Sequence, residues 1–143
     1  MAILTEDLII LQAVAVNKED AIRKCGQLLV DAGRVEAGYV DGMLARERTM
    51  STYLGNGVSI PHGEYDNRAQ ILRTGLSILQ IPQGVEWEDG EKAYLVIGIA
   101  AQEDEHVNVL ANLAEAVEEE EITRLLITTK EKQVILDYLG EGD

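Results

Sequence analysis

Hydrophobic residues recur along the first third of the chain with the spacing of α-helices. Asn17 is a suitable N-cap and Gly33 a suitable stop for a helix between them. The apolar positions inside that segment step by three or four residues, at Ile22, Cys25, Leu28, Leu29 and Ala32. A second helix is predicted from about Glu36 to Arg48. Its buried side would consist of Val40, Met43 and Leu44.

The middle of the chain has the patterns of β-strands instead. Residue types alternate from Leu72 to Leu79, which predicts a strand, and Val58–Ile60 is a shorter candidate between glycines. The run Tyr94–Ala101 is apolar without alternation, which is typical of a central strand covered on both faces. This longest apolar run is less than half of the roughly 20 residues that cross a bilayer, so we expect a soluble protein.

The last third of the chain returns to helical spacing. Acidic residues in Gln102–Glu105 suit the positive end of a helix dipole. Apolar positions and one histidine then repeat at helical spacing, at His106, Leu110, Leu113 and Val117. Two shorter helices are predicted at Glu120–Ile127 and Lys130–Leu139. The predicted fold is an α/β single-domain sandwich over residues 1–143, with a mixed, mostly parallel sheet of about five strands flanked by helices on both faces.

Composition narrows the possible partners. The 143 residues suit one domain, and 12 Lys plus Arg against 26 Asp plus Glu give a net charge of −14. This charge argues against nucleic acid and anionic membranes as partners. Residues Met1–Asp7 carry two acids and no base, unlike a targeting peptide, so we expect a cytoplasmic protein without membrane insertion.

Metals and cofactors have little support in the sequence. The two histidines lie 44 positions apart, and with a single cysteine they match no metal-ligand spacing. Gly55-Asn56-Gly57 lacks the later GK[ST] of a nucleotide-binding loop, and Ser59 lies outside a GxSxG motif. Cys25 lies on an apolar helix face and is expected in the core, and Glu118–Glu121 is interpreted as a solvated helix junction. We therefore expect neither cofactor nor metal.

The residues best suited to chemistry, several arginines and a histidine in a Pro-His-Gly turn, cluster around His62. The segment from Arg46 to Arg73 contains four arginines and three acids, so it carries a net positive charge within a strongly acidic chain. His62 stands in a Pro-His-Gly turn, where it would be accessible, and a histidine is mostly neutral near pH 7 and can act as a nucleophile or base. The alternative is a turn histidine without a function.

A second histidine, His106, stands where the predicted central strand gives way to a helix. Open α/β sheets bind ligands at such a junction, so His106 is a candidate auxiliary residue that should lie beside His62. The alternative is a partly buried histidine that a backbone carbonyl satisfies.

These residues resemble the mannitol/fructose type of IIA component of the bacterial phosphoenolpyruvate:sugar phosphotransferase system. The resemblance is carried by Arg46-Glu47-Arg48 and by Tyr53–Gly63, which reads YLGNGVSIPHG. Later in the chain Leu95–Ala101 and Glu105–Leu110 match in the same order. Ile81–Trp87, together with the first of these later stretches, resembles the mannitol branch more than the fructose or nitrogen-regulatory branches.

The resemblance implies a phosphocarrier. The histidine matching His62 would accept a phosphoryl group from the phosphohistidine of the carrier protein HPr and pass it to a cysteine of the IIB component. Arg46 and His106 would flank the phosphohistidine, and Nε2 would carry the phosphoryl group. Some mannitol-type members have an acid where this chain has Asn56, so a carboxylate role there does not transfer.

Elementary phosphoryl-transfer chemistry agrees with this reading. The transition state is loose and carries charge on the phosphoryl oxygens, so positioned groups and positive charge are what the protein must supply. Two hypotheses remain open at this stage. The first is a transport phosphotransferase that serves a mannitol IIB domain. The second is a regulatory module of the same fold, from the fructose or nitrogen-regulatory branch, whose phosphorylation state controls a binding partner.

Overall fold

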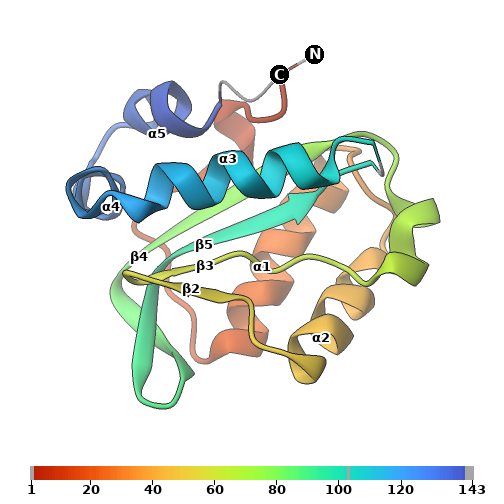
Figure 1. Ribbon diagram of the computed structural model, residues 1–143, viewed down its shortest axis with the longest axis horizontal. Helices are drawn as coiled ribbons and strands as arrows, with labels where there is room; N and C mark the ends of the chain where they lie inside the picture. Colours follow the sequence, from red (N-terminus) through yellow and green to blue (C-terminus); the bar gives the residue numbers. More distant parts are fainter. Residues whose placement is uncertain (1, 103, 141–143) are drawn as a thin grey trace.

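A mixed β-sheet forms the centre of the protein. The computed structural model describes residues 2–102 and 104–140, so Glu103 and the chain ends lie outside the described residues. Within that part the sheet has five strands in the order β1-β4-β5-β3-β2 (Figure 1). Their bounds are β1 Ile9–Ile10, β2 Tyr53–Gly55, β3 Val58–Ser59, β4 Gly75–Glu88 and β5 Glu91–Ala100. Pairs β1–β4 and β3–β5 are parallel, and β2–β3 and β4–β5 are antiparallel.

Helices cover both faces of this sheet, as predicted (Figure 1). In the described residues the α-helices are α1 Lys18–Asp31, α2 Tyr39–Thr49, α3 His106–Glu118, α4 Glu120–Thr128 and α5 Lys132–Leu139. Ser77 of β4 donates a hydrogen bond to the Cys25 carbonyl of α1, at 2.7 Å. Gln80 of the same strand donates to the Leu126 carbonyl of α4, at 3.1 Å. Side chains three positions apart on a strand point to opposite faces, so α1 and α4 lie on opposite sides.

The central strand is the one predicted from the apolar run. β5 lies between β4 and β3, and Leu95–Ile97 and Ile99–Ala100 are completely buried. The strand predicted over Leu72–Leu79 begins instead at Gly75 and continues to Glu88. Leu72 and Arg73 are not part of it because their backbone N–H groups both donate to the Arg34 carbonyl. The register shift between Gln80 and Val85 accommodates Pro82, which cannot donate to the ladder.

The first two helices follow the predicted signals with one shift. The Asn17 side chain accepts a hydrogen bond from Asp20 N at 2.8 Å, which confirms the N-cap of α1. Helix α2 begins at Tyr39 rather than near Glu36, because Val35 pairs with Ile71 in a β-bridge and Glu36 N donates to the Gln70 carbonyl.

The three helices on the other face match their predicted positions. They contribute apolar positions that include Val109, Leu113, Leu126 and Ile135, all buried in the hydrophobic core. Glu118–Glu121 is exposed where α3 passes into α4, which confirms the solvated helix junction. No helix in the described part of the chain is long and apolar enough to span a membrane.

Candidate functional site

His62 lies at the end of a strand that runs parallel to β5. Val58 pairs with Leu95 and Ser59 with Val96, and the same register continues to an isolated bridge between His62 and Ile99. The Ile99 N–H donates to the Pro61 carbonyl at 2.9 Å. The turn that carries His62 is therefore tied to the buried carboxyl end of the central strand.

His106 reaches the same edge of the sheet by a different path. It is the first residue of α3, which follows the end of β5 after a short connection. Because β3 and β5 are parallel neighbours, the chain segments that leave their carboxyl ends emerge side by side. The ring centroids of His62 and His106 are 5.7 Å apart and their planes make an angle of 66°. The structure thus brings together the two histidines, as the sequence predicted.

The imidazole of His62 is held in one orientation by its own backbone. Its Nδ1 lies 2.8 Å from the carbonyl oxygen of Ile60. A carbonyl oxygen can only accept, so Nδ1 carries the proton and Nε2 keeps its lone pair. Burial lowers the pKa of His62, and the charges of Arg46 and His106 lower it further, while the Ile60 carbonyl opposes them. The ring is therefore neutral at pH 7 with Nε2 as its nucleophilic atom.

Arg46 supplies positive charge to the same cavity. It lies in the last turn of α2 and lines a cavity of about 620 Å³ together with His62 and His106. Its Nη1 donates to the Met50 carbonyl at 2.5 Å, which closes the end of the helix. Within the described residues its guanidinium makes no other hydrogen bond, so four of its five N–H groups remain for an anion.

Tyr39 fixes the turn that follows His62. Its hydroxyl accepts from Gly63 N at 2.9 Å and donates to the Ile99 carbonyl at 2.8 Å. A Cβ at Gly63 would lie 2.6 Å from a ring carbon of Tyr39, so the glycine permits this close packing. Burial raises the pKa of Tyr39 to about 12, so its hydroxyl stays protonated. Sequence reasoning missed Tyr39, since a tyrosine at the start of a helix gives no local signal of this contact.

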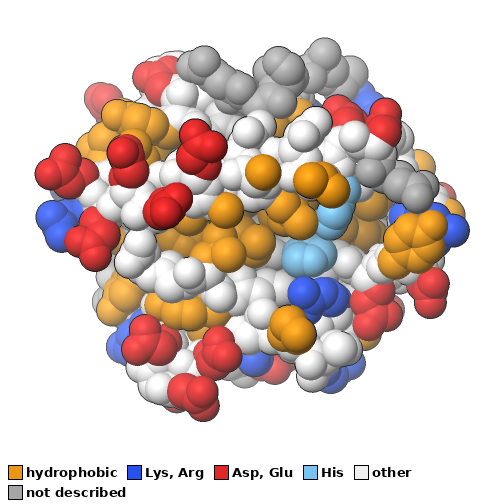
Figure 2. All heavy atoms as spheres, in the orientation of Figure 1, with side chains coloured by type: hydrophobic (Ala, Val, Ile, Leu, Met, Phe, Trp, Pro, Cys, Tyr) orange, Lys and Arg blue, Asp and Glu red, His pale blue; other side chains and the backbone are white. Residues whose placement is uncertain are grey.

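The lining of the cavity also includes exposed apolar side chains together with the charged residues Glu64, Asp66 and Arg68. Tyr65 and Val107 line it and are 65% and 74% exposed, and the Arg68 guanidinium lies 3.7 Å from the centroid of the Tyr65 ring. Figure 2 shows the two histidines in pale blue beside apolar side chains, with a basic side chain next to them. Most acidic side chains on this face lie toward its periphery. This surface suits a partner that brings its own anionic group.

The single cysteine of the chain is not among the residues that line this cavity. Cys25 is fully buried, and burial raises the pKa of its thiol to about 12, which confirms a core position. In residues 2–102 and 104–140, no three His, Cys, Asp or Glu side chains are grouped so that they could hold a metal ion.

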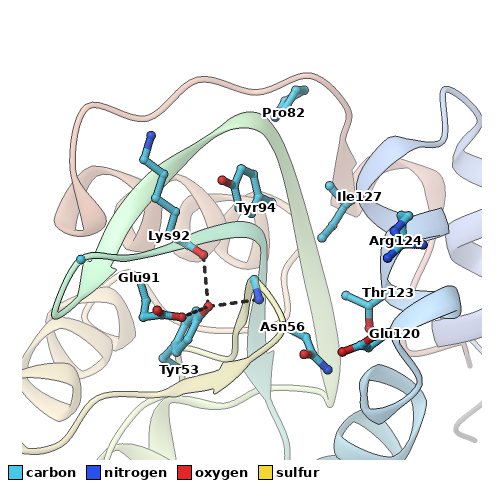
Figure 3. A pocket seen from close by; sticks show the side chains of 12 residues that line it. Tyr53, Asn56, Pro82, Glu91, Lys92, Tyr94, Glu120, Thr123, Arg124 and Ile127 are labelled. Carbon is cyan, nitrogen blue, oxygen red and sulfur yellow. Dashed lines mark hydrogen bonds between the residues drawn. The ribbon is translucent and has the colours of Figure 1, made fainter.

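A second cavity, of about 760 Å³, lies at the opposite end of β5 (Figure 3). It contains neither histidine and is lined by Tyr53, Tyr94, Lys92 and Arg124, among others. The Tyr53 hydroxyl accepts from Gly57 N at 3.1 Å and lies 3.2 Å from the Lys92 carbonyl, so it supports the turn between β2 and β3. The cavity with both histidines is therefore the candidate site.

Comparisons with known proteins agree on one family. The sequence profile described as "Phosphoenolpyruvate-dependent sugar phosphotransferase system, EIIA 2" matches residues 2–142. A multiphosphoryl transfer protein of Salmonella typhimurium is 50% identical over 128 residues, which cover 87% of this chain and 34% of that protein. The chain thus spans about a third of the length of this relative.

Two further relatives match over nearly their whole lengths. The mannitol-specific phosphotransferase enzyme IIA component of Geobacillus stearothermophilus is 42% identical, with 99% of this chain and 97% of that protein covered. A structure of enzyme IIAMTL in complex with phosphorylated enzyme IIBMTL from Escherichia coli superimposes with a TM-score of 0.89 at 38% identity. That match covers 94% of this chain and 95% of the other. On these grounds the chain belongs to the EIIA 2 family of the phosphoenolpyruvate-dependent sugar phosphotransferase system.

Proposed function

We propose that this chain is a phosphocarrier that accepts a phosphoryl group from the phosphohistidine of HPr on His62 and transfers it to a cysteine of a mannitol-specific IIB component. The observation that carries the proposal is the bond between His62 Nδ1 and the Ile60 carbonyl. It leaves a neutral imidazole with a free Nε2 lone pair at a cavity that Arg46 and His106 also line. The cytoplasmic location expected from the sequence goes with this proposal and stays a prediction.

The two transfers need no cofactor in this scheme. In the first, the Nε2 lone pair of His62 forms a bond to phosphorus while the donor's N–P bond breaks, and that electron pair returns to the donor imidazole. In the second, a cysteine thiolate forms an S–P bond while the Nε2–P bond breaks, which restores neutral His62. The proton stays on Nδ1 throughout and is donated in a hydrogen bond to the Ile60 carbonyl. Each transfer thus balances with no added proton or metal.

Arg46 and His106 have electrostatic roles in this proposal. The charge that develops on the equatorial phosphoryl oxygens is stabilised by positive groups and hydrogen-bond donors that are already in place. The unused N–H groups of Arg46 offer a planar fork of donors, and the neighbouring His106 ring can donate one further hydrogen bond. Neither residue has to move a proton for the reaction to balance.

The partners are proteins according to this proposal. Val107 and Tyr65 are exposed apolar side chains on the rim of the cavity, and exposed Met50 belongs to the segment that binds Arg46. Apolar and aromatic side chains around a recessed reactive group are typical of a docking surface. The IIAMTL of Escherichia coli, which shares this fold, forms a complex with phosphorylated IIBMTL.

The proposal also specifies mannitol as the sugar that the IIB partner serves. The relatives that match this chain over nearly their full length at 39% and 42% identity are named mannitol-specific. The multiphosphoryl transfer proteins, at about 50% identity, carry no sugar in their names. Transfer to a mannitol IIB domain must therefore be compared directly with transfer to a fructose IIB domain.

Labelling experiments test the function and the sugar in turn. Radiolabelled phosphoenolpyruvate, the general phosphotransferase enzyme and HPr should label the wild-type chain but not the His62→Ala variant. The labelled chain should then transfer its phosphoryl group faster to a purified mannitol IIB domain than to a fructose IIB domain. Stoichiometric labelling of His62→Ala would refute the acceptor. Preference for the fructose domain would refute the sugar, and transfer to neither would favour the regulatory module.

A further inference from the structure

Glu47 is a buried carboxylate directly after Arg46. Its side chain accepts hydrogen bonds from Thr52 N at 3.1 Å, from Thr52 Oγ1 at 2.6 Å and from Trp87 Nε1 at 3.0 Å. Glu47 is 5% exposed, and the Nζ atom of Lys18, a partly exposed side chain, lies 4.0 Å from its Oε2. Removing a carboxylate from water is costly, and three donors offset that cost at this position.

A chain of hydrogen bonds connects this carboxylate to the imidazole of His62. Glu47 binds both the N–H and the hydroxyl of Thr52. The Thr52 carbonyl accepts from Ile60 N at 3.0 Å, and the Ile60 carbonyl accepts from His62 Nδ1 at 2.8 Å. The carbonyl that selects the His62 tautomer thus belongs to a residue that Thr52 holds in register.

The same carboxylate also holds the segment to which Arg46 is hydrogen-bonded. The Arg46 guanidinium donates to the carbonyl of Met50, two residues before Thr52 in the segment that leaves α2. The Thr52 end of that segment is held by Glu47, and Trp87 of β4 holds Glu47 from the other side. One buried group therefore fixes the segment on which both Arg46 and, through Ile60, His62 depend.

We propose that Glu47 is a positioning residue for phosphoryl transfer, which orients His62 and Arg46 by fixing the segment Met50–Thr52. The proposal rests on the proposed function, in which His62 is the phosphoryl acceptor. The charge of Glu47 adds to this geometric effect. Burial is the main cause that lowers the pKa of His62, and the negative charge of Glu47 raises that pKa. A purely structural contact between α2 and β4 would stabilise the fold and leave the His62 ring unaffected.

The Glu47→Gln variant separates these two roles. A carboxamide has one acceptor oxygen and carries no charge, so it cannot bind Thr52 and Trp87 as the carboxylate does. We expect the rate of phosphoryl transfer from HPr at saturation to fall about tenfold, while the HPr concentration at half-maximal rate stays unchanged. In the unphosphorylated protein, ¹⁵N NMR should show a lower His62 pKa and mixed imidazole tautomers.

Matched variants complete the test. Glu115→Gln removes an exposed carboxylate from α3 and should change none of these readouts. Thr52→Val removes the hydroxyl that binds Glu47 and should slow phosphoryl transfer, although less than Glu47→Gln does. Thr52→Ser keeps the hydroxyl and should transfer at the wild-type rate. These threonine variants also decide the question if Glu47→Gln does not fold.

Three outcomes distinguish the two proposals. Normal transfer and a normal His62 tautomer in Glu47→Gln, with only lowered stability, would overturn the positioning role. Equal transfer rates in Thr52→Val and Thr52→Ser would overturn it as well. If wild-type protein is not labelled on His62, the proposed function fails, whereas the NMR measurements on unphosphorylated protein still decide whether Glu47 orients the ring.

Discussion

The Nδ1 atom of His62 lies 2.8 Å from the carbonyl oxygen of Ile60, two residues earlier in the chain. The neutral ring therefore carries its single proton on Nδ1, because the carbonyl has no hydrogen to donate. We predict that the phosphoryl group is attached to Nε2 of His62 and that the label is lost in acid, as expected of a phosphoramidate. ¹⁵N and ³¹P NMR of the phosphorylated protein can identify the substituted nitrogen. Substitution at Nδ1 would contradict the hydrogen bond as the orienting contact.

Acid should switch off phosphoryl acceptance. Burial, then the charges of Arg46 and His106, lower the pKa of His62 below its usual value near 6.5. As pH falls through this lowered pKa, Nε2 takes up a proton and the nucleophilic lone pair disappears. The initial rate of labelling by HPr as a function of pH, with an NMR titration of His62, measures the effect. A rate midpoint above pH 6.5 would contradict it.

The same lowered pKa affects the stability of the fold. The unfolded chain binds a proton at His62 near pH 6.5, whereas the folded chain does so only at lower pH. The contribution of His62 is therefore fully present above pH 6.5 and is lost as pH falls through the folded pKa. Denaturant unfolding of wild type and His62→Gln should show a stability difference that depends on pH in this window. A constant difference would contradict the shift.

Replacement of Arg46 should slow transfer without unfolding the protein. A charge-assisted hydrogen bond contributes about 1.5–3 kcal/mol, so Arg46→Gln should slow labelling by roughly ten- to a hundredfold. The pKa of His62, which burial lowers first and Arg46 second, should rise in this variant. Arg48→Gln is the matched control, because Arg48 is exposed in the same helical turn. Normal transfer by folded Arg46→Gln would exclude Arg46 from the site.

His106 should matter more for holding the phosphoryl group than for accepting it. With the two rings 5.7 Å apart, a phosphoryl group on His62 places negative charge next to the His106 imidazole, which can donate a hydrogen bond to it. His106→Ala should accept label from HPr but retain or deliver it poorly. The ¹⁵N NMR signals of the His106 ring should shift on phosphorylation, as its N–H binds a phosphoryl oxygen. Unchanged shifts together with normal delivery would leave His106 without this role.

Loss of the Tyr39 hydroxyl should destabilise the turn that carries His62. Tyr39→Phe would leave the Gly63 N–H and the buried Ile99 carbonyl without their shared partner. An unpaired buried polar group costs about 1–3 kcal/mol, which chemical denaturation can measure. Tyr138→Phe, on the exposed side of α5, is the control and should unfold like wild type. Equal stability of the two variants would show that water replaces the lost bonds.

Local signals were sufficient for the longer elements. The Asn17 cap and helical spacing predicted α1, and the apolar run predicted β5. Strands β1 and β2 were not located because two or three residues show no periodicity. The extension of β4 to Glu88 was also missed, although Asp89 and Gly90, with φ of 48° and 83°, form the Asp-Gly turn that is a known hairpin signal.

The sequence by itself determined the family, the candidate histidine and the residue types around it, because a Pro-His-Gly turn and its neighbouring arginines are local features. Only the tertiary structure decided which groups meet. The parallel pairing of β3 with β5 places His62 and His106 side by side across 44 residues. The packing of α2 brings the Tyr39 hydroxyl to the Ile99 carbonyl, 60 residues away in the sequence. Such contacts depend on strand order and register, which non-local packing sets and residue spacing does not encode.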